Sequence, residues 1–448
     1  MPHLRRALGR WDLVLLKVVA IVNINNVPPV AVYGWTSLAL WGLAFLTFFV
    51  PEAIAVLALS RRYPGEGGVY LWTRARFGDA HGFFSGWCYW TCNLFYIPVL
   101  LIYLAGIFAF LGGGRSAGLV DRPLFVAGVA FAWLALITAA NIRGLGTGKW
   151  IQNAGGVGAC LGIGLVLGAA LASEMRGVAE VPPALARAGW EMAASFAVMC
   201  NAFVGVELAS TMGDEIDDPA RDLPFAVYAA GALSLASYVL VTGAVLLLVP
   251  VGRLGVIQGV MQAVSAGAAQ AGVSWLVAPL ALVMALSIGG TASAWFAGSS
   301  RIPFVAGLER ALPAALGRVH PRWRSPYVAL GTCALLAAAL TTWALAGSGV
   351  AEAYQVLLKS SVVIQLVPFV YLFLALVTLP DGTRAHTAAG AAGLAATVIG
   401  VIAAFLPTAD VASVPIFEAK MVIGVAAPAA LGWALFRRSR RHSLQDTP

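Results

Sequence analysis

Long apolar runs recur along the whole chain, and they constrain its fold more than any other feature. A helical run of about 20 apolar residues matches the hydrocarbon thickness of a bilayer, and backbone groups in lipid must be bonded within their own segment. Only 11% of the 448 residues are charged and 60% are hydrophobic, whereas about a quarter of a soluble domain is charged. We therefore expect an all-α integral membrane protein, and not a soluble, disordered or nucleic-acid-binding chain.

Hydropathy predicts twelve membrane-spanning helices with short connections and no soluble domain. The expected spans are residues 11–33, 35–59, 80–112, 123–140, 150–172, 191–213, 224–250, 273–299, 327–347, 352–379, 385–406 and 415–436. Most of the 28 Lys and Arg residues fall on alternate connections, and the positive-inside tendency then places both termini in the cytoplasm. No cleavable leader is expected, so we predict a multi-pass protein of the cytoplasmic (inner) membrane.

The five cysteines all fall inside predicted spans, so no disulfide is expected. They are Cys88, Cys92, Cys160, Cys200 and Cys333.

Two of the predicted spans carry interruptions at corresponding depths. The first contains the segment Asn23–Pro29, in which two prolines remove backbone donors. The sixth contains Asn201–Glu207, where Gly205 lies beside a carboxylate. Matched interruptions five spans apart are typical of inverted repeats that bind a ligand near the bilayer midplane. The alternative is a pair of ordinary kinked helices.

Several linked motifs resemble those of the amino acid–polyamine–organocation transporters. Arg62–Trp72 with Phe77-Gly78 resembles their loop between helices 2 and 3, Phe203–Glu207 with Glu215 and Asp218–Pro224 resembles their helix 6 and the loop after it, and Ala297–Arg301 with Leu312-Pro313 resembles the end of their helix 8. Within that superfamily the chain is most similar to the glutamate/GABA antiporters and related amino acid exchangers. The shared features are Glu66–Val69 and Tyr96–Pro98.

The resemblance implies a LeuT-like fold of five plus five helices in inverted repeat, with two further C-terminal helices. Residues 1–448 would form one transporter domain, with repeats at 11–172 and 191–379 and the added helices at 385–436. It implies alternating access and an amino acid or related amine as substrate, held between helices 1, 3, 6, 8 and 10. A polyamine or another organic amine is the alternative substrate. Proton-coupled symport and substrate exchange both remain open, as does oligomeric state.

The chain departs from the superfamily at two places that matter for binding. Many members carry a Gly-Ser-Gly-type segment in helix 1, whereas this chain has Asn25-Asn26-Val27-Pro28. Proline cannot donate a hydrogen bond, so asparagine side chains would replace backbone amides as donors. Some proton-coupled relatives also have a lysine in the middle of helix 5, whereas here Lys149 lies near the start of that helix.

The candidate substrate-binding residues lie on helices 1, 3, 6 and 8. Buried amides are costly unless bonded, glycine permits close approach to the backbone, and aromatic side chains can close over a ligand, as expected for Phe203. The opposite interpretation is that the asparagines patch a broken helix and the aromatics only fill the core. The candidates are Asn23, Asn25, Asn26, Val27, Tyr96, Cys200, Asn201, Phe203, Gly205 and Trp295.

Four of the ionisable residues inside predicted spans bear on the mechanism. Glu207 is the principal candidate for proton coupling or gating, with Glu52 and Lys359 as further candidates. Lys17 is expected to extend its ammonium group to the cytoplasmic surface. Sodium coupling stays open because Ser293 and Ser299 lie in helix 8.

Three other interpretations of the sequence are less favoured than a transporter with a midplane site. The acidic segment Asp214–Asp218 would suit a Mg²⁺-dependent intramembrane transferase, but no facing acidic motif exists, so the segment is expected to cap and pair with arginines such as Arg221. A channel is disfavoured by the matched helix breaks. Gly65–Gly68 lacks the context of a phosphate-binding loop and predicts a tight turn against the bundle. We expect no enzymatic activity, cofactor or metal.

Overall fold

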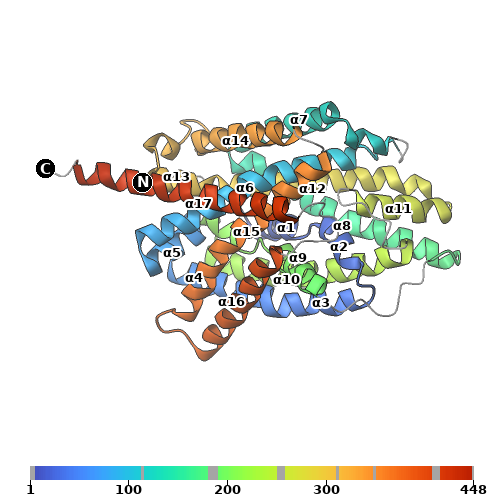
Figure 1. The fold of residues 1–448 in the computed structure, drawn as a ribbon, viewed down its shortest axis with the longest axis horizontal. Coiled ribbons are helices and arrows are strands. Elements are labelled where there is room, and N and C mark those ends of the chain that lie inside the picture. Colours follow the sequence, from blue (N-terminus) through green and yellow to red (C-terminus); the bar gives the residue numbers. More distant parts are fainter. Residues whose placement is uncertain are drawn as a thin grey trace.

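The computed structural model describes residues 6–112, 116–179, 190–249, 258–308, 312–346, 350–405 and 414–445. Within these ranges the protein is helical, with no β-strand, and most helices run along one axis of the molecule (Figure 1). The helices are α1 (Arg10–Ile21), η1 (Ile24–Asn26), α2 (Pro28–Ala31), α3 (Thr36–Ala44), η2 (Phe45–Phe49), α4 (Val50–Arg62), α5 (Val69–Phe77), α6 (Asp79–Phe108), η3 (Ala117–Asp121), α7 (Pro123–Ile142), α8 (Leu145–Met175), α9 (Trp190–Ala202), η4 (Glu207–Glu215), α10 (Pro219–Leu248), α11 (Gly259–Gln270), η6 (Ser274–Leu276), α12 (Val277–Ser299), α13 (Arg301–Leu308), η7 (Ala314–Gly317), α14 (Tyr327–Leu345), α15 (Val350–Val377), α16 (Arg384–Ala404) and α17 (Val414–Gln445).

Nine helical segments of the described chain are long and apolar enough to cross a membrane. They are Thr36–Arg62, Asp79–Phe108, Pro123–Ile142, Leu145–Met175, Pro219–Leu248, Ser274–Gly307, Tyr327–Leu345, Leu357–Val377 and Arg384–Ala404. Each coincides with a span expected from hydropathy. The remaining three expected spans correspond to α1 with α2, to α9 with η4, and to α17. The first two are absent from the nine because each is broken into pieces shorter than a bilayer crossing.

Both predicted interruptions are present. α1 ends at Ile21, and the chain resumes as α2 only at Pro28, where proline occupies the first helical turn without needing a donor. α9 ends at Ala202, a turn follows, and Gly205 has a φ of 138° before η4 begins. That φ lies in a region that side chains other than glycine avoid, so the glycine allows the helix to break.

Three shorter helices were not expected from the sequence. α5 and α13 lie in segments read as loops, and α11 lies between the seventh and eighth expected spans. Each has 12 or fewer residues, too few to cross a bilayer, so a hydropathy window does not detect it. The turn before α5 agrees with the prediction for Gly65–Gly68, since Gly65, Gly67 and Gly68 have positive φ and the latter two are buried.

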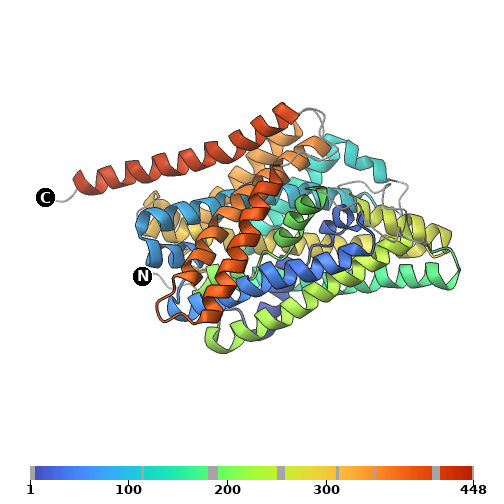
Figure 2. The same cartoon turned by 60° about the horizontal axis from the view of Figure 1, so that its bottom comes forward.

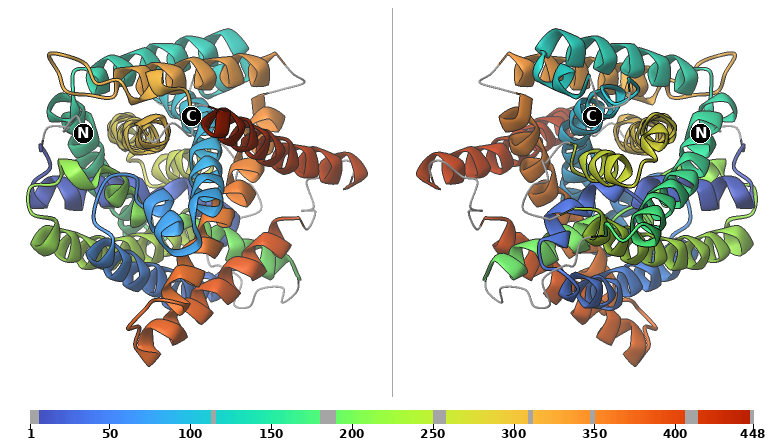
Figure 3. Two further views of the ribbon diagram at one scale, coloured as in Figure 1. Left: turned by 90° about the vertical axis from the view of Figure 1, so that its left-hand side faces the viewer. Right: turned by 90° about the vertical axis from the view of Figure 1, so that its right-hand side faces the viewer.

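Large apolar side chains are exposed on the outer helices, as expected of a surface that faces lipid. Leu124, Met175, Leu335 and Ile402 are among them, on α7, α8, α14 and α16. α17 lies on the outside and extends past the rest of the molecule at one end (Figure 2). Both marked termini lie toward that same end, and Figure 3 shows the helices from the two ends of the long axis.

α8, which is the fifth expected span, packs against α12, which is the eighth. A Cβ atom on Gly155 would lie 2.7 Å from the Cα of Gly290 and 2.8 Å from Val19 of α1. Two glycines therefore let the backbones touch, and they bring α1 into the same layer. This packing fixes the wall against which the broken helix 1 lies.

We expect Gly155→Leu to destabilise the protein, because the new side chain has no room between α8, α12 and α1. Overpacking of this kind costs about 1–3 kcal/mol or more. The matched control is Gly168→Leu on the same helix, where a Cβ atom meets nothing within 4 Å. Thermal unfolding of the detergent-solubilised protein should show a lowered midpoint for the first variant only. Equal midpoints for both variants would contradict the close-packing account.

Candidate functional site

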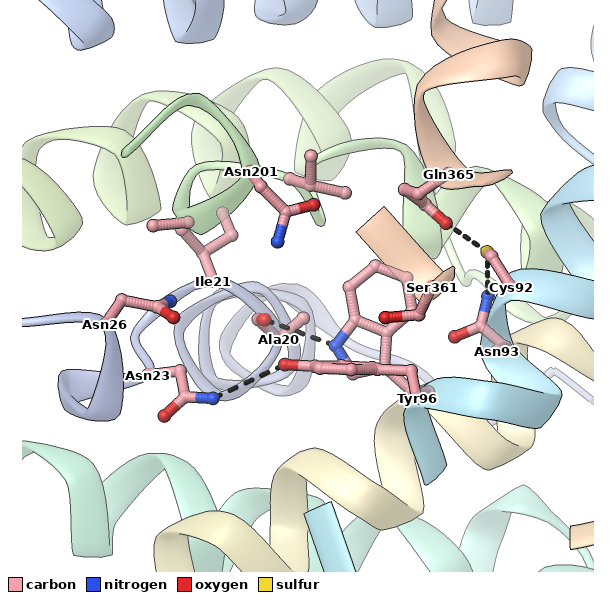
Figure 4. A pocket seen from close by; sticks show the side chains of 13 residues that line it. Ala20, Ile21, Asn23, Asn26, Cys92, Asn93, Tyr96, Asn201, Ser361 and Gln365 are labelled. Carbon is pink, nitrogen blue, oxygen red and sulfur yellow. Dashed lines mark hydrogen bonds between the residues drawn. The ribbon is translucent and has the colours of Figure 1, made fainter. Parts of the chain in front are cut away.

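A cavity lies between the two broken helices and the continuous helices α6, α12 and α15. Its lining combines amides, hydroxyls and a thiol with a few apolar groups (Figure 4). The lining residues are Ala20, Ile21, Asn23, Asn26, Cys92, Asn93, Tyr96, Asn201, Ala202, Val204, Trp295, Ser361 and Gln365. The volume is about 30 Å³, enough for about two water molecules. A larger molecule therefore enters only if the surrounding helices move apart.

One tyrosine hydroxyl joins the ends of both broken helices. Tyr238 of α10 places its hydroxyl 2.6 Å from the carbonyl oxygen of Ile21 and 3.0 Å from that of Ala202. The same hydroxyl accepts a hydrogen bond of 3.2 Å from the backbone N–H of Asn23. With its one hydrogen the hydroxyl donates to either carbonyl, and its oxygen accepts from Asn23, so backbone groups left by the breaks are bonded within the protein, as lipid-embedded structure requires.

The broken end of α1 is further held by α12 and α6. Trp295 donates its indole N–H to the carbonyl of Ala20 at 3.2 Å, and Thr291 donates to the carbonyl of Val19 at 2.7 Å. The Asn23 side-chain amide donates to the Tyr96 hydroxyl at 3.3 Å, a contact marked in Figure 4. These bonds place Asn23 and Tyr96 at the cavity in defined orientations.

Five of the predicted binding residues line the cavity: Asn23, Asn26, Tyr96, Asn201 and Trp295. Figure 4 shows the amide of Asn201 directed toward the centre of the space, opposite Tyr96. The side chain of Asn25 lies outside the described residues. Val27, Cys200 and Gly205 are near the breaks but are not among the lining residues.

Phe203 lies away from the cavity, although the sequence predicted an aromatic gate there. It is fully buried among aromatic rings of the neighbouring helices, with ring centroids 5.8 Å from Trp41, 5.6 Å from Phe45 and 5.4 Å from Tyr238. The turn at 203–206 directs this side chain toward α3 and α10. In this conformation Phe203 packs the broken helix against them.

Four polar lining residues were not predicted. Cys92 and Asn93 lie on α6 one turn before Tyr96, and Ser361 and Gln365 lie one turn apart on α15. The thiol of Cys92 is a donor to Gln365 Oε1, and Asn93 donates its side-chain amide to the carbonyl of Tyr89 at 2.8 Å. The i, i+4 spacing of Ser361 and Gln365 was the available sequence signal, because it places both on one helical face.

A cluster of buried ionisable groups lies beside the cavity. Glu207 is fully buried; its Oε1 accepts from the Tyr89 hydroxyl at 3.0 Å, and its Oε2 accepts from the backbone N–H of Gly205 at 2.9 Å. Glu52 of α4 is also fully buried, and its charge interacts with those of Glu207 and Lys17. The break in helix 6 therefore supplies a hydrogen bond to one of two neighbouring carboxylates.

The expectation that Lys17 reaches the cytoplasmic surface is wrong. Lys17 is fully buried, and its ammonium group donates to the carbonyl of Val206, with Glu207 and Glu52 acting on it electrostatically. The carbonyl is available because helix 6 is broken there, and the two carboxylates offset the cost of burying the charge. Lys359 of α15 is half-buried and does not line the cavity.

The two serines considered for sodium are both buried on α12. Ser293 accepts a hydrogen bond of 3.1 Å from Asn141 of α7, and Ser299 lies at the last residue of the helix. Neither is among the residues that line the cavity.

Comparison with known proteins identifies the family. Residues 8–428 match the family described as amino acid permease. The chain belongs to this family. An uncharacterized transporter of Legionella pneumophila is 24% identical over 98% of both chains. The branched-chain amino acid permease of Bacillus subtilis is 25% identical over 73% of this chain and 72% of its own, and the low-affinity putrescine importer of Escherichia coli is 26% identical over 64% and 63%.

The family and the names of the relatives point to a transporter and not to an enzyme. The acidic segment Asp214–Asp218 makes its contacts within the protein. Within the described chain no group of three or more His, Cys, Asp or Glu residues is arranged to hold a metal ion. Asp218 instead caps α10 by accepting from the backbone N–H of Arg221, and Asp214 donates its backbone N–H to Glu66 at 3.1 Å. The segment serves as a structural connection in this permease.

Arg301, the first residue of α13, contacts η4 and the turn before α5. Its Nη2 lies 2.7 Å and its Nε 2.9 Å from Glu215 Oε1, and its Nε lies 3.9 Å from Glu66. All three side chains are more than nine-tenths buried. Burial raises the pKa of Glu66 well above its usual value near 4.5, the nearby charge of Glu215 raises it further, and Arg301 opposes the shift. Burial also raises the pKa of Glu215, against the effect of Arg301.

We expect Arg301→Met to destabilise the permease by about 3–5 kcal/mol, because a buried carboxylate loses its partner. Arg74→Met is the matched control, since the Arg74–Asp79 pair is largely exposed and such pairs contribute about 1 kcal/mol at most. Chemical unfolding of the purified protein measures both. A loss for Arg301→Met no greater than that of the control would show that the buried pair contributes little.

The raised pKa of Glu66 predicts a pH-dependent difference between the permease and its Glu66→Gln variant. A carboxyl with a raised pKa in the folded state stabilises the fold fully below its unfolded pKa, and that contribution is lost as pH rises through the folded pKa. The variant has no such loss and can keep the bond from Asp214. Thermal midpoints between pH 5 and 9 should therefore favour the variant increasingly as pH rises. A difference that is constant with pH would contradict the shift.

Proposed function

We propose that this permease is a secondary active transporter that moves amino acids or related amines across the cytoplasmic membrane by alternating access. The observation that carries the proposal is the position of the polar cavity, which lies between two helices broken at matching depths. Broken helices of this kind expose helix ends to a ligand at the midplane. The names of the relatives, a branched-chain amino acid permease and a putrescine importer, support the substrate class.

The proposed architecture has twelve membrane-spanning helices in a LeuT-like arrangement. Residues 11–172 and 191–379 would be the inverted repeats, with 385–436 added after them. The two broken helices, five spans apart, support this division. The distribution of basic residues supports cytoplasmic termini and insertion in the inner membrane. The first, second, sixth and seventh expected spans would rotate together against the other spans. This movement would expose the cavity to each side of the membrane in turn.

We further propose proton coupling at the buried cluster, with substrate exchange as the alternative source of driving force. Two carboxylates, Glu207 and Glu52, share a single buried lysine, Lys17. Two adjacent buried carboxylates resist simultaneous ionisation, so a shared proton restores neutrality. Glu207 also bonds Gly205 at the break and Tyr89 of α6. Loss or gain of that proton would therefore change the contacts that hold the broken helix 6 beside the cavity.

The experiment that tests transport uses the purified permease in liposomes. We expect counterflow of at least one labelled amino acid or amine when the vesicles are preloaded with the same compound, and none in vesicles without protein. An absence of counterflow across a panel of amino acids and polyamines would overturn the proposal. An imposed pH gradient then separates symport, which responds to it, from strict exchange, which does not.

Glu207→Gln is expected to abolish the pH dependence of uptake while it preserves exchange, because the glutamine oxygen can accept from the Gly205 N–H and the glutamine amide can donate to the Tyr89 hydroxyl, but the side chain cannot release a proton. The matched control is Glu174→Gln, at an exposed position near the end of α8. Uptake measured at several pH values, with and without a gradient, distinguishes the two variants. An unchanged pH profile in Glu207→Gln would remove Glu207 from the coupling mechanism.

A further inference from the structure

The walls of the cavity carry many hydrogen-bonding groups but no charge. Among the residues that line it in the described chain, none is Asp, Glu, Lys, Arg or His. Burying a net charge without an opposite charge nearby is costly. A diamine with two ammonium groups, or an amino acid with a charged side chain, is therefore disfavoured by these walls. A zwitterion with a neutral side chain is favoured.

One wall of the cavity can accommodate the two charges of a zwitterion. The C-terminal ends of α1 and α9 carry partial negative charge and suit an ammonium group. The amides of Asn23, Asn26 and Asn201 are donors for a carboxylate on the same side of the cavity. In Figure 4 these asparagines lie opposite Gln365, Cys92 and Asn93, so a side chain on such a substrate would point toward α6 and α15.

The second observation is the buried side-chain amide of Gln365, on the wall formed by α6 and α15. Its side chain is 94% buried, since only 6% of its surface is exposed. Its Oε1 accepts from the Cys92 thiol, while its Nε2 has no hydrogen-bond partner among the described residues. A buried donor left unpaired costs free energy, so it favours a ligand that brings an acceptor. Ser361, one turn away, adds a hydroxyl at the same wall.

From these observations we infer that the substrate is a neutral amino acid whose side chain ends in a hydrogen-bond acceptor, as in glutamine, asparagine, serine and threonine, and that Gln365 selects it. The inference rests on the proposed transport function and names the substrate class of that same cavity. A substrate oxygen accepts from Gln365 Nε2, and the zwitterionic head binds at the helix breaks. A branched apolar side chain leaves the Gln365 amide unpaired, and a diamine meets no anionic group.

The test is counterflow in liposomes with glutamine, serine, leucine, glutamate and putrescine as labelled compounds. The wild-type permease should exchange glutamine and serine in preference to the other three. Gln365→Leu should reduce the glutamine-to-leucine ratio roughly 3- to 10-fold, the value of one lost hydrogen bond. Gln365→Glu should reduce glutamine exchange further and, when labelled lysine is added as a sixth compound for this variant, admit lysine, because a carboxylate repels acceptors and attracts cations.

The matched control is Gln152→Leu. Gln152 of α8 is also buried, its side-chain amide also has no partner among the described residues, and it does not line the cavity. This variant should keep the wild-type selectivity. Preference of the wild type for leucine, glutamate or putrescine would overturn the inference and leave transport intact, as would an unchanged ratio in folded Gln365→Leu. If none of the five compounds is exchanged, the inference is overturned, and the proposed function fails with it only if the wider panel of amino acids and polyamines also shows no counterflow. Wild-type selectivity decides the inference even if both Gln365 variants fail to fold.

Discussion

Backbone groups within a bilayer must be bonded by the protein, because no water is present to bond them. Two helices of this permease are broken, and the rest of the site follows from how the backbone groups freed at the breaks are bonded. The Tyr238 hydroxyl contacts the last carbonyls of α1 and α9, while Trp295 and Thr291 donate to the two carbonyls that precede it in α1. The break in helix 6 exposes the Val206 carbonyl to Lys17 and the Gly205 amide to Glu207. The cavity and the buried charges thus both follow from the need to bond the backbone groups at the two breaks.

In the mechanism we propose, substrate recognition and proton coupling occupy separate groups of residues that contact each other. The cavity walls are uncharged, whereas the neighbouring cluster contains Lys17, Glu52 and Glu207. Helix α6 connects them: Tyr89 donates to Glu207, and Asn93, which lines the cavity, donates to the carbonyl of Tyr89. In the mechanism we propose, a proton change at the cluster is transmitted along this short path to the substrate site.

The sequence predicted the broken helices well, because their causes are local. Two adjacent prolines remove backbone donors and disfavour helical geometry before them, and glycine permits the positive φ that the break in helix 6 uses. Asn23, Asn201 and Glu207 were recognised for the same reason, as polar groups at those interruptions. Gln365 and Cys92 were not predicted because they lie in continuous helices, where spacing shows which residues share a face but only tertiary packing determines which face borders the cavity. Lys17 was misplaced because its partners belong to helices far away in the sequence.

A structure determined with a transported amino acid bound tests the central claim most directly. The account predicts that the ligand lies between the breaks of helices 1 and 6, with its charged head near Asn23 and Asn201 and its side-chain oxygen within hydrogen-bond distance of Gln365. Density for the ligand elsewhere, for example in the apolar groove between α4 and α10, with the space between the breaks unchanged, would contradict it.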